Sequence, residues 1–188
     1  MRIALFGGTF DPVHNAHLSI AREAARQCTL DRIWFIPASR PPHKSGLTWA
    51  PYEDRYRMVE LACAGDPRFE ASRLEAGAQN SYSIETIERV RASLGGGEEL
   101  FFLIGADAFA EIRTWHRWRE VIASVEFIVV SRPGGAYREP EGARIHRLEG
   151  VDLAVSSSEI RSKLAAGDDR VEVPPAVLAY IREHGLYR

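Results

Sequence analysis

Short apolar runs alternate with amphipathic segments along most of the chain. Consecutive apolar residues bounded by polar or turn residues are typical of strands that are buried on both faces. Such runs occur at Ile3–Phe6, Ile33–Ile36, Leu100–Ile104 and Phe127–Val130, with a shorter one in Phe69–Leu74. Apolar residues that recur at a spacing of three and four predict helices over Ala16–Gln27, Tyr52–Ala64, Ser83–Leu94 and Trp118–Ala123.

Start and stop signals predict two more helices near the C-terminal end. Ser156-x-x-Glu159 has the pattern of a capping box and opens a helix over Ile160–Ala166, which Gly167 ends. Pro174-Pro175 opens a last helix, which Gly185 ends.

Buried strands separated by helices predict an α/β fold. Right-handed crossovers leave few topologies, and they favour a Rossmann-like, doubly wound parallel sheet with helices on both faces. The 188 residues suit one compact domain, and we expect residues 1–188 to form it. Ala38–Ala50 and Arg132–Arg144 are rich in Pro, Gly and charge, and we expect them to be loops over a site at the carboxyl ends of the strands.

Composition and charge argue against several kinds of partner. The formal net charge is -2, so no bulk basic field draws the chain to nucleic acid. Cys28 and Cys63 form no CxxC pair, which disfavours a disulfide framework or a zinc site and favours a reducing cytoplasm. The first apolar stretch is too short for a signal peptide, and no later one is long enough to span a membrane. The sequence leaves open whether the chain forms a homo-oligomer.

The segment Gly7–Leu18 follows the first strand and leads into the first helix. Its glycines allow a sharp turn, and the start of the helix offers free N–H groups and the positive end of the dipole. His14 and His17 would lie on one face of that helix and could donate hydrogen bonds to phosphate oxygens without a fixed double positive charge. The alternative is an ordinary turn with two surface histidines. The combination after a buried strand favours a phosphate site, and the Walker A and GxGxxG motifs are absent.

This segment resembles the GGTFDPxHxGH signature of the nucleotidylyltransferase superfamily, and specifically of the nicotinate mononucleotide adenylyltransferases. Further segments match that family in the same order, over nearly the whole chain: Pro41-Pro42-His43-Lys44, Asn80-Ser81-Tyr82-Ser83, Ile104–Asp107, Thr114–Trp118, Val155–Arg161 and Tyr180–Tyr187. Ala16 stands where the superfamily often has Gly, and Ser83 and Ser158 replace Thr. These changes remove no charged group and no hydroxyl.

The resemblance implies that the 5′-phosphate of nicotinate mononucleotide attacks the α-phosphorus of ATP, giving nicotinate adenine dinucleotide and pyrophosphate in NAD biosynthesis. A phosphate monoester has a second pKa of about 6, so the nucleophile needs no general base. Catalysis should then consist of positioning and electrostatic stabilisation. A magnesium ion should accompany ATP, held mainly by phosphates and water, with no metal ligands assigned on the protein. The implied catalytic residues are His14, His17, Lys44 and Arg161.

For the ATP half, the resemblance implies binding by Gly7, Gly8, Thr9, Phe10, Gly105, Asp107, Ser156, Ser157 and Ser158. Several alternatives remain open. Thr9 could only close the turn, Phe10 could pack beneath the site, and Asp107 could cap a helix as well as accept from a ribose hydroxyl. Asp11 could brace the loop or contact a ligand, and the charges of Arg161 and Lys44, taken alone, could simply be solvated.

For the nicotinate half, the implied residues are Ser81, Tyr82, Ser83, Trp115 and Lys44. Free amides at the start of the helix that follows Ser81-Tyr82 would bind a carboxylate better than a carboxamide. Trp115 could stack on the pyridine ring, while Trp118 shares a helical face with Val121 and belongs to the core; the alternative places both tryptophans in the core. We therefore expect a preference for nicotinate over nicotinamide mononucleotide.

Three other functions fit parts of the pattern. Another member of the superfamily could use phosphopantetheine as the acceptor or transfer a cytidylyl group, but Ser81-Tyr82-Ser83, Trp115 and the C-terminal end argue against this. A non-catalytic sensor of dinucleotides would not need all the cationic donors. A class I aminoacyl-tRNA synthetase has an HxGH-like motif, but this chain lacks room for an anticodon-binding region.

Overall fold

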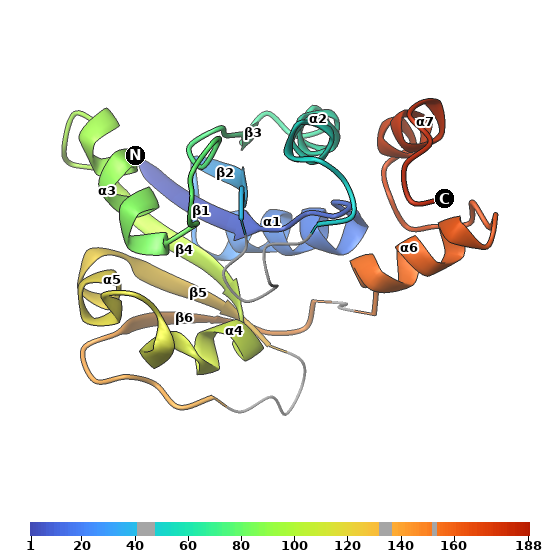
Figure 1. Ribbon diagram of the computed structural model, residues 1–188. Helices are drawn as coiled ribbons and strands as arrows, with labels where there is room; N and C mark the ends of the chain where they lie inside the picture. The colour runs from blue at the N-terminus through green and yellow to red at the C-terminus, as the bar shows by residue number, and fades with distance from the viewer. Residues whose placement is uncertain (41–47, 132–136, 152–153) are drawn as a thin grey trace.

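The computed structural model describes residues 1–40, 48–131, 137–151 and 154–188. At its centre is a six-stranded sheet in which all pairings are parallel, with the order β3-β2-β1-β4-β5-β6 (Figure 1). The strands are β1 (Arg2–Gly8), β2 (Arg32–Pro37), β3 (Phe69–Ala71), β4 (Glu99–Gly105), β5 (Glu126–Val130) and β6 (Arg144–Leu148). This is the order of a doubly wound sheet, which reverses between β1 and β4. The predicted fold class is confirmed.

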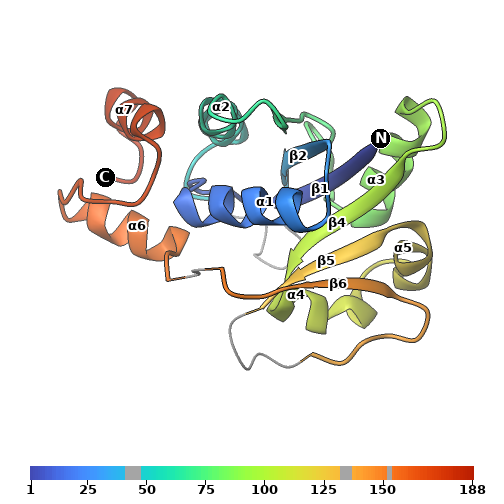
Figure 2. The same ribbon diagram turned by 180° about the vertical axis from the view of Figure 1, so that it is seen from behind.

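Each face of the sheet carries its own hydrophobic core. Ala4 and Phe6 of β1 belong to one core, whereas Ile3 and Leu5 belong to the other, as expected for alternating side chains of a strand. The first core includes residues of α1 (Asn15–Gln27), α2 (Tyr52–Cys63), α6 (Ser157–Ala165) and α7 (Pro175–Glu183). The second includes residues of α3 (Ser83–Ser93), α4 (Ala106–Ala110), the 3-10 helix η1 (Ile112–Thr114) and α5 (Trp118–Ser124). Helix α1 accordingly lies behind the sheet in Figure 1 and in front of it in Figure 2.

The helices and strands that the sequence predicts are all present, with small shifts at their ends. Helix α6 begins at Ser157 instead of Ile160, because Ser156 is its N-cap and accepts a hydrogen bond from the Glu159 amide at 3.2 Å. Three elements were not predicted: α4 and η1 are too short to show a periodicity, and β6 is an edge strand with exposed arginines instead of an apolar run. The interpretation of Asp107 as a helix cap is wrong, since Gly105 is the N-cap of α4 and Asp107 is exposed in its first turn.

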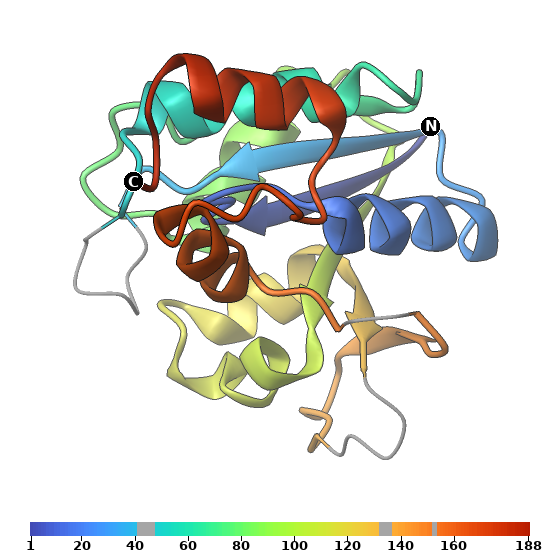
Figure 3. The ribbon, with the colours of Figure 1, turned by 90° about the vertical axis from the view of Figure 1, so that its right-hand side faces the viewer.

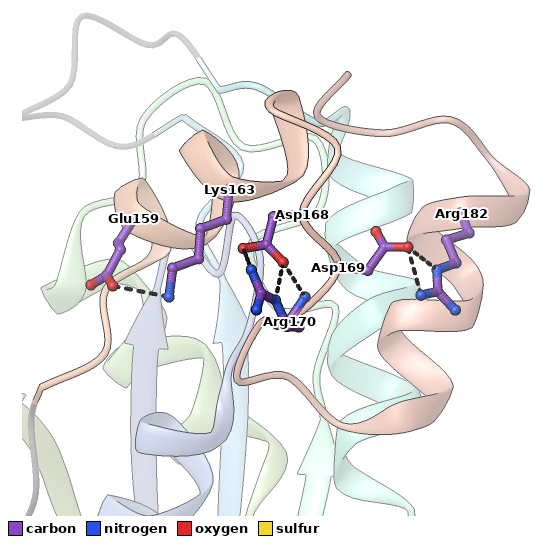
Figure 4. A network of polar contacts seen from close by, with 6 residues as sticks. All are labelled: Glu159, Lys163, Asp168, Asp169, Arg170 and Arg182. Atoms are coloured by element: carbon purple, nitrogen blue, oxygen red, sulfur yellow. Dashed lines mark hydrogen bonds and ion pairs between the residues drawn. The ribbon is translucent and has the colours of Figure 1, made fainter.

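The connection between α6 and α7 is a tight turn followed by exposed ion pairs. Gly167 ends α6 as predicted, with a φ of 76° that glycine adopts without strain, and the amide of Asp168 closes the turn on the Lys163 carbonyl at 2.9 Å. Asp169 pairs with Arg182 of α7 at 2.6 Å (Figure 4). The neighbouring pairs are Glu159–Lys163 at 3.2 Å and Asp168–Arg170 at 2.9 Å. Such exposed pairs add little stability.

Within the described ranges, no helix combines the length and the apolar character that crossing a bilayer requires. Both cysteines are buried and unpaired. Burial raises the pKa of the Cys28 thiol and raises that of Cys63 to about 12, so neither is activated as a nucleophile.

Candidate active site

The segment from Gly7 to His14 leaves β1 where the strand order of the sheet reverses. Gly7 and Gly8 lie opposite Ile36 and Pro37 at the end of β2, and Gly105 ends β4 on the other side of β1. Ligands of doubly wound sheets bind at this edge, outside the carboxyl ends of the strands. The fold therefore places the motif at the expected edge of the sheet.

Gly8 and Phe10 set the course of this segment. Phe10 has a φ of 48°, in the left-handed region that is unusual for a bulky side chain, and its ring is 2% exposed. A Cβ at position 8 would lie 2.9 Å from the Phe10 ring, so only glycine fits there without movement. Phe10 thus packs beneath the segment, which is the alternative that the sequence left open.

His14 and His17 lie side by side at the start of α1. Their rings stack with centroids 3.7 Å apart and an interplanar angle of 23°. His14 is the N-cap of the helix, and its amide donates to Nδ1 of His17 at 3.2 Å. Because Nδ1 of His17 accepts this bond, a neutral His17 carries its proton on Nε2. The prediction that the two histidines lie together on one face is confirmed, and Nε2 of His17 is left as the N–H donor of the ring.

Both histidines are neutral at physiological pH. Burial lowers the pKa of His14 to about 4. Burial, followed by the neighbouring His14, holds the pKa of His17 well below its ordinary value of 6.5. The edges of Phe6 and Phe10, with centroids 5.9 and 5.0 Å from that of His17, form part of this apolar environment. The free protein therefore presents imidazole donors, as the sequence analysis expected, and not a pair of cations.

Helix α6 is joined to the same segment through its first residues. Nη1 of Arg161 donates to the Asp11 carbonyl at 2.8 Å, and Nη2 donates to Oγ of Ser158 at 3.2 Å. The Ser157 hydroxyl donates to the Pro12 carbonyl at 2.9 Å. Residues about 150 positions apart in sequence therefore meet at the Asp11–His14 stretch, and Arg161 is a held side chain instead of a solvated one.

Arg55 is a residue of the site region that sequence reasoning missed. It is 1% exposed, and it donates to the Thr9 carbonyl at 2.7 Å and to the Ala50 carbonyl at 3.2 Å. Burial lowers its pKa, and the nearby Asp11 opposes that shift. A signal was present in the sequence: Arg55 lies three and four residues before Met58 and Val59, on the buried face of α2.

A cavity of about 410 Å³ opens beside the Gly7–Thr9 stretch. Ser81, Tyr82, Ser83 and Trp115, which the sequence assigned to the nicotinate half, all line it. The other lining residues among those described are Gly7, Gly8, Thr9, Ile36, Ala38, Glu75, Phe102, Ile104, Ala108, Thr114 and His116. The structure thus brings the predicted mononucleotide residues together, in a mostly apolar pocket that suits a flat ring.

The two tryptophans differ in their relation to this cavity. Trp115 is half-buried in the cavity wall and packs edge-on against Phe102, with centroids 5.9 Å apart. Both tryptophans pack against the core of the second face of the sheet, and Trp118 is not among the described residues that line the cavity. Tyr82 lies against His116 at 4.7 Å, which closes another part of the wall.

Glu75 is a second residue that the sequence analysis missed. It is 7% exposed, lines the cavity, and accepts a hydrogen bond from the Thr86 hydroxyl at 2.8 Å. Burial raises the pKa of its carboxyl, while Ser81, Thr86, Arg89 and the Ser39 amide oppose that rise. No motif or periodicity in the sequence indicated that this carboxyl would be buried.

Several predicted residues belong neither to the polar cluster around His14 and His17 nor to the lining of the cavity. Gly105, the last residue of β4, and Asp107 of α4 are not among the described lining residues of the cavity, although their neighbours Ile104 and Ala108 are. Ser156 is engaged as the N-cap of α6. Lys44 and the rest of Pro41-Pro42-His43-Lys44 lie outside the described residues. The described ranges also contain no group of three or more His, Cys, Asp or Glu side chains that could hold a metal ion.

Comparisons with known proteins agree with this geometry. Residues 5–163 match the cytidylyltransferase-like family. A probable nicotinate-nucleotide adenylyltransferase from Solibacter usitatus is 59% identical over the whole of both chains, and one from Thermus thermophilus is 43% identical, also over the whole of both chains. Among solved structures, a nicotinic acid mononucleotide adenylyltransferase of Plasmodium falciparum complexed with NaAD has the same fold, with a TM-score of 0.80 at 18% identity over 99% of this chain and 97% of that one. The chain therefore belongs to the cytidylyltransferase-like family and, within it, to the nicotinate-nucleotide adenylyltransferases.

Proposed function

We propose that the protein transfers the adenylyl group of ATP to nicotinate mononucleotide, giving nicotinate adenine dinucleotide and pyrophosphate for NAD biosynthesis. The observation that carries the proposal is the stacked, neutral His14–His17 pair, which follows in the chain directly after the Gly7–Thr9 stretch that lines the cavity. Full-length relatives named nicotinate-nucleotide adenylyltransferases support the assignment.

The proposed chemistry is a single displacement at the α-phosphorus. An oxygen of the mononucleotide 5′-phosphate forms the new bond, and the bond from the α-phosphorus to the bridging oxygen breaks, with its electron pair leaving on pyrophosphate. The Nε2–H of His17 and the guanidinium of Arg161 stabilise the charge on the phosphates, and Lys44 adds a second permanent charge. We expect ATP to enter as its magnesium complex, because magnesium is readily held by phosphates and water.

The remaining ATP contacts fall to backbone amides and to the carboxylate of Asp107. The first turn of α6 supplies amides of Ser157 and Ser158, whose hydroxyl oxygens are already bonded to the protein. Asp107 is exposed in the first turn of α4 and can accept from a ribose hydroxyl. At Gly105, the last residue of β4, no atom of the described residues other than its two chain neighbours lies within 4 Å of where a Cβ would be, which allows a ligand to approach.

The acceptor half is the cavity. The start of α3, where no side chain caps the helix, places Tyr82 and Ser83 in the cavity wall, and free amides there favour a carboxylate. Trp115 supplies an aromatic face for the pyridine ring. This arrangement favours nicotinate over nicotinamide, because the carboxamide gains less from the helix terminus.

Pyrophosphate release with a panel of substrates tests the proposal. The purified protein is given magnesium and either ATP or CTP, with nicotinate mononucleotide, nicotinamide mononucleotide or phosphopantetheine as acceptor. We expect ATP and nicotinate mononucleotide to be used best, with kcat/KM at least about tenfold above that for the amide. Equal use of acid and amide would refute the carboxylate argument alone, whereas no release with either would refute adenylyl transfer.

A further inference from the structure

The C-terminal end of the chain returns to the segment that carries His14. After α7 the chain turns at Gly185, and its end lies on the side to which β1 and β2 point (Figure 3). The hydroxyl of Tyr187 donates to Oδ1 of Asp11 at 2.6 Å. Tyr187, which follows α7, is thus hydrogen-bonded to a residue three positions before His14.

The carboxylate of Asp11 is a junction for three donors. It is 4% exposed and accepts from the amides of Trp49 and Ala50, at 2.7 and 3.1 Å, as well as from Tyr187. The pKa of the Tyr187 phenol is raised far above its ordinary value by burial and by Asp11, so Tyr187 remains a donor at any working pH. Asp11 therefore braces the loop, which is one of the two roles that the sequence left open.

The same stretch of backbone also holds Arg161. The Asp11 carbonyl accepts from Nη1 of Arg161, and the guanidinium of Arg161 lies over the Trp49 ring, 5.4 Å from its centroid. A shift of Asp11 would therefore move the acceptor of Arg161 and the chain that leads to His14. Removing one of three donors from a buried carboxylate leaves it under-bonded, which favours such a shift.

We infer that Tyr187 is a positioning residue for the phosphate site: through Asp11 it fixes His14, His17 and Arg161 in the arrangement that ATP requires. The inference rests on the proposed function of that site. Tyr187 acts through Asp11, and it is not among the described residues that line the mononucleotide cavity. Its loss should therefore weaken the use of ATP and leave the binding of the mononucleotide nearly unchanged.

Two matched tyrosine variants test this role. Tyr187→Phe removes the hydroxyl bonded to Asp11, and Tyr180→Phe removes an equivalent hydroxyl, which donates to Oδ1 of Asp54 at 2.8 Å and joins α7 to α2. We expect Tyr187→Phe to lower kcat/KM for ATP by about tenfold or more and to change KM for nicotinate mononucleotide by less than about twofold. Tyr180→Phe should change both constants by less than about twofold, even where thermal unfolding shows a similar loss of stability.

Two outcomes would overturn the inference. Equal effects of the two variants would make Tyr187 merely a structural residue, and an unchanged kcat/KM for ATP in Tyr187→Phe would remove the role altogether. If Tyr187→Phe does not fold, Asp11→Asn tests the same junction and should show the same selective loss for ATP. Calorimetric titration of the wild type and Tyr187→Phe with magnesium-ATP tests the inference separately from the proposed function. We expect the variant to bind ATP more weakly, and this loss can be measured even if the true adenylyl acceptor is not nicotinate mononucleotide.

Discussion

The two parts of the site are built in opposite ways. The histidine end, consisting of Asp11, His14, His17 and Arg161, is a set of polar groups joined by one local hydrogen bond between the histidines and by one between Arg161 and the distant Asp11. The end that we assign to the pyridine ring, called the pyridine end below, is the cavity around Trp115. The walls of this cavity are mostly apolar and include the buried carboxyl of Glu75. Charge that develops in a transition state is stabilised by hydrogen-bond donors that are already in position, whereas a flat ring is recognised by the shape of its pocket and a few polar groups. Changes at the first end should therefore act on turnover, and changes at the second on KM for the mononucleotide.

The largest effect should come from His17→Ala. Loss of the Nε2–H donor should lower kcat by about 1000-fold, as for a removed oxyanion-type donor, and weaken ATP binding by less than about tenfold. Steady-state kinetics and calorimetric ATP titration measure the two effects. His184→Ala is the control, because its imidazole stacks on Tyr180 with centroids 3.9 Å apart, outside both ends of the site. Equal, small losses of turnover and ATP affinity in His17→Ala would instead suit a nucleotide sensor.

Arg161→Lys should come next, with kcat/KM for ATP lowered by about 100-fold. Lysine keeps the charge but cannot reproduce the forked contacts with the Asp11 carbonyl and the Ser158 hydroxyl. Arg182→Lys makes the same chemical change on α7, where two nitrogens of Arg182 donate to the carboxylate of Asp169 (Figure 4). This variant should leave turnover unchanged. Near-normal turnover of Arg161→Lys would show that charge alone is enough at the histidine end.

The same contrast explains how far the sequence could predict this molecule. The buried strands, the helices and the pairing of His14 with His17 follow from local periodicity and from spacing within one turn, so they were predictable. The Ser81–Ser83 segment and Trp115 were found through family motifs, and the structure places them in one cavity.

What the sequence could not provide are contacts between segments that only the fold brings together. No local pattern indicates that Arg55 donates a hydrogen bond to the Thr9 carbonyl, or that Tyr187 donates one to Asp11, 176 positions away. Burial of Glu75 likewise depends on the packing of its loop against α3. Strand β6 was missed because an edge strand does not need a continuous apolar run.

At the pyridine end, Trp115→Leu should raise KM for nicotinate mononucleotide by about two- to tenfold and change kcat little, since a lost aromatic contact is worth about 0.5–1.5 kcal/mol. Initial rates at saturating ATP measure this effect. Trp118→Leu removes an equally large ring that packs against the core but is not among the described cavity residues, so it should lower stability more than it changes KM. If Trp118→Leu raised KM as much as Trp115→Leu, the assignment of Trp115 to the ring would be wrong.

The smallest effect should come from Glu75→Gln, and it should appear in stability. The folded protein raises the pKa of this carboxyl above its ordinary value of 4.5, so the unfolded chain loses the proton first as the pH rises. Wild-type stability is therefore lowered progressively from about pH 4.5 upward, through the raised pKa.

Glutamine keeps the acceptor for Thr86 and has no charge to bury, so Glu75→Gln should raise Tm by roughly 2 °C at neutral pH and by less near pH 4. Glu53→Gln is the control of opposite sign, because hydrogen bonding to Arg73 lowers the pKa of Glu53 and its charge stabilises the folded state above about pH 4.5. Thermal unfolding of both variants at several pH values measures the difference. A Tm gain for Glu75→Gln that does not grow with pH would mean that the cavity carboxyl is as well solvated as one on the surface. The description of the cavity as the apolar end of the site would then be wrong.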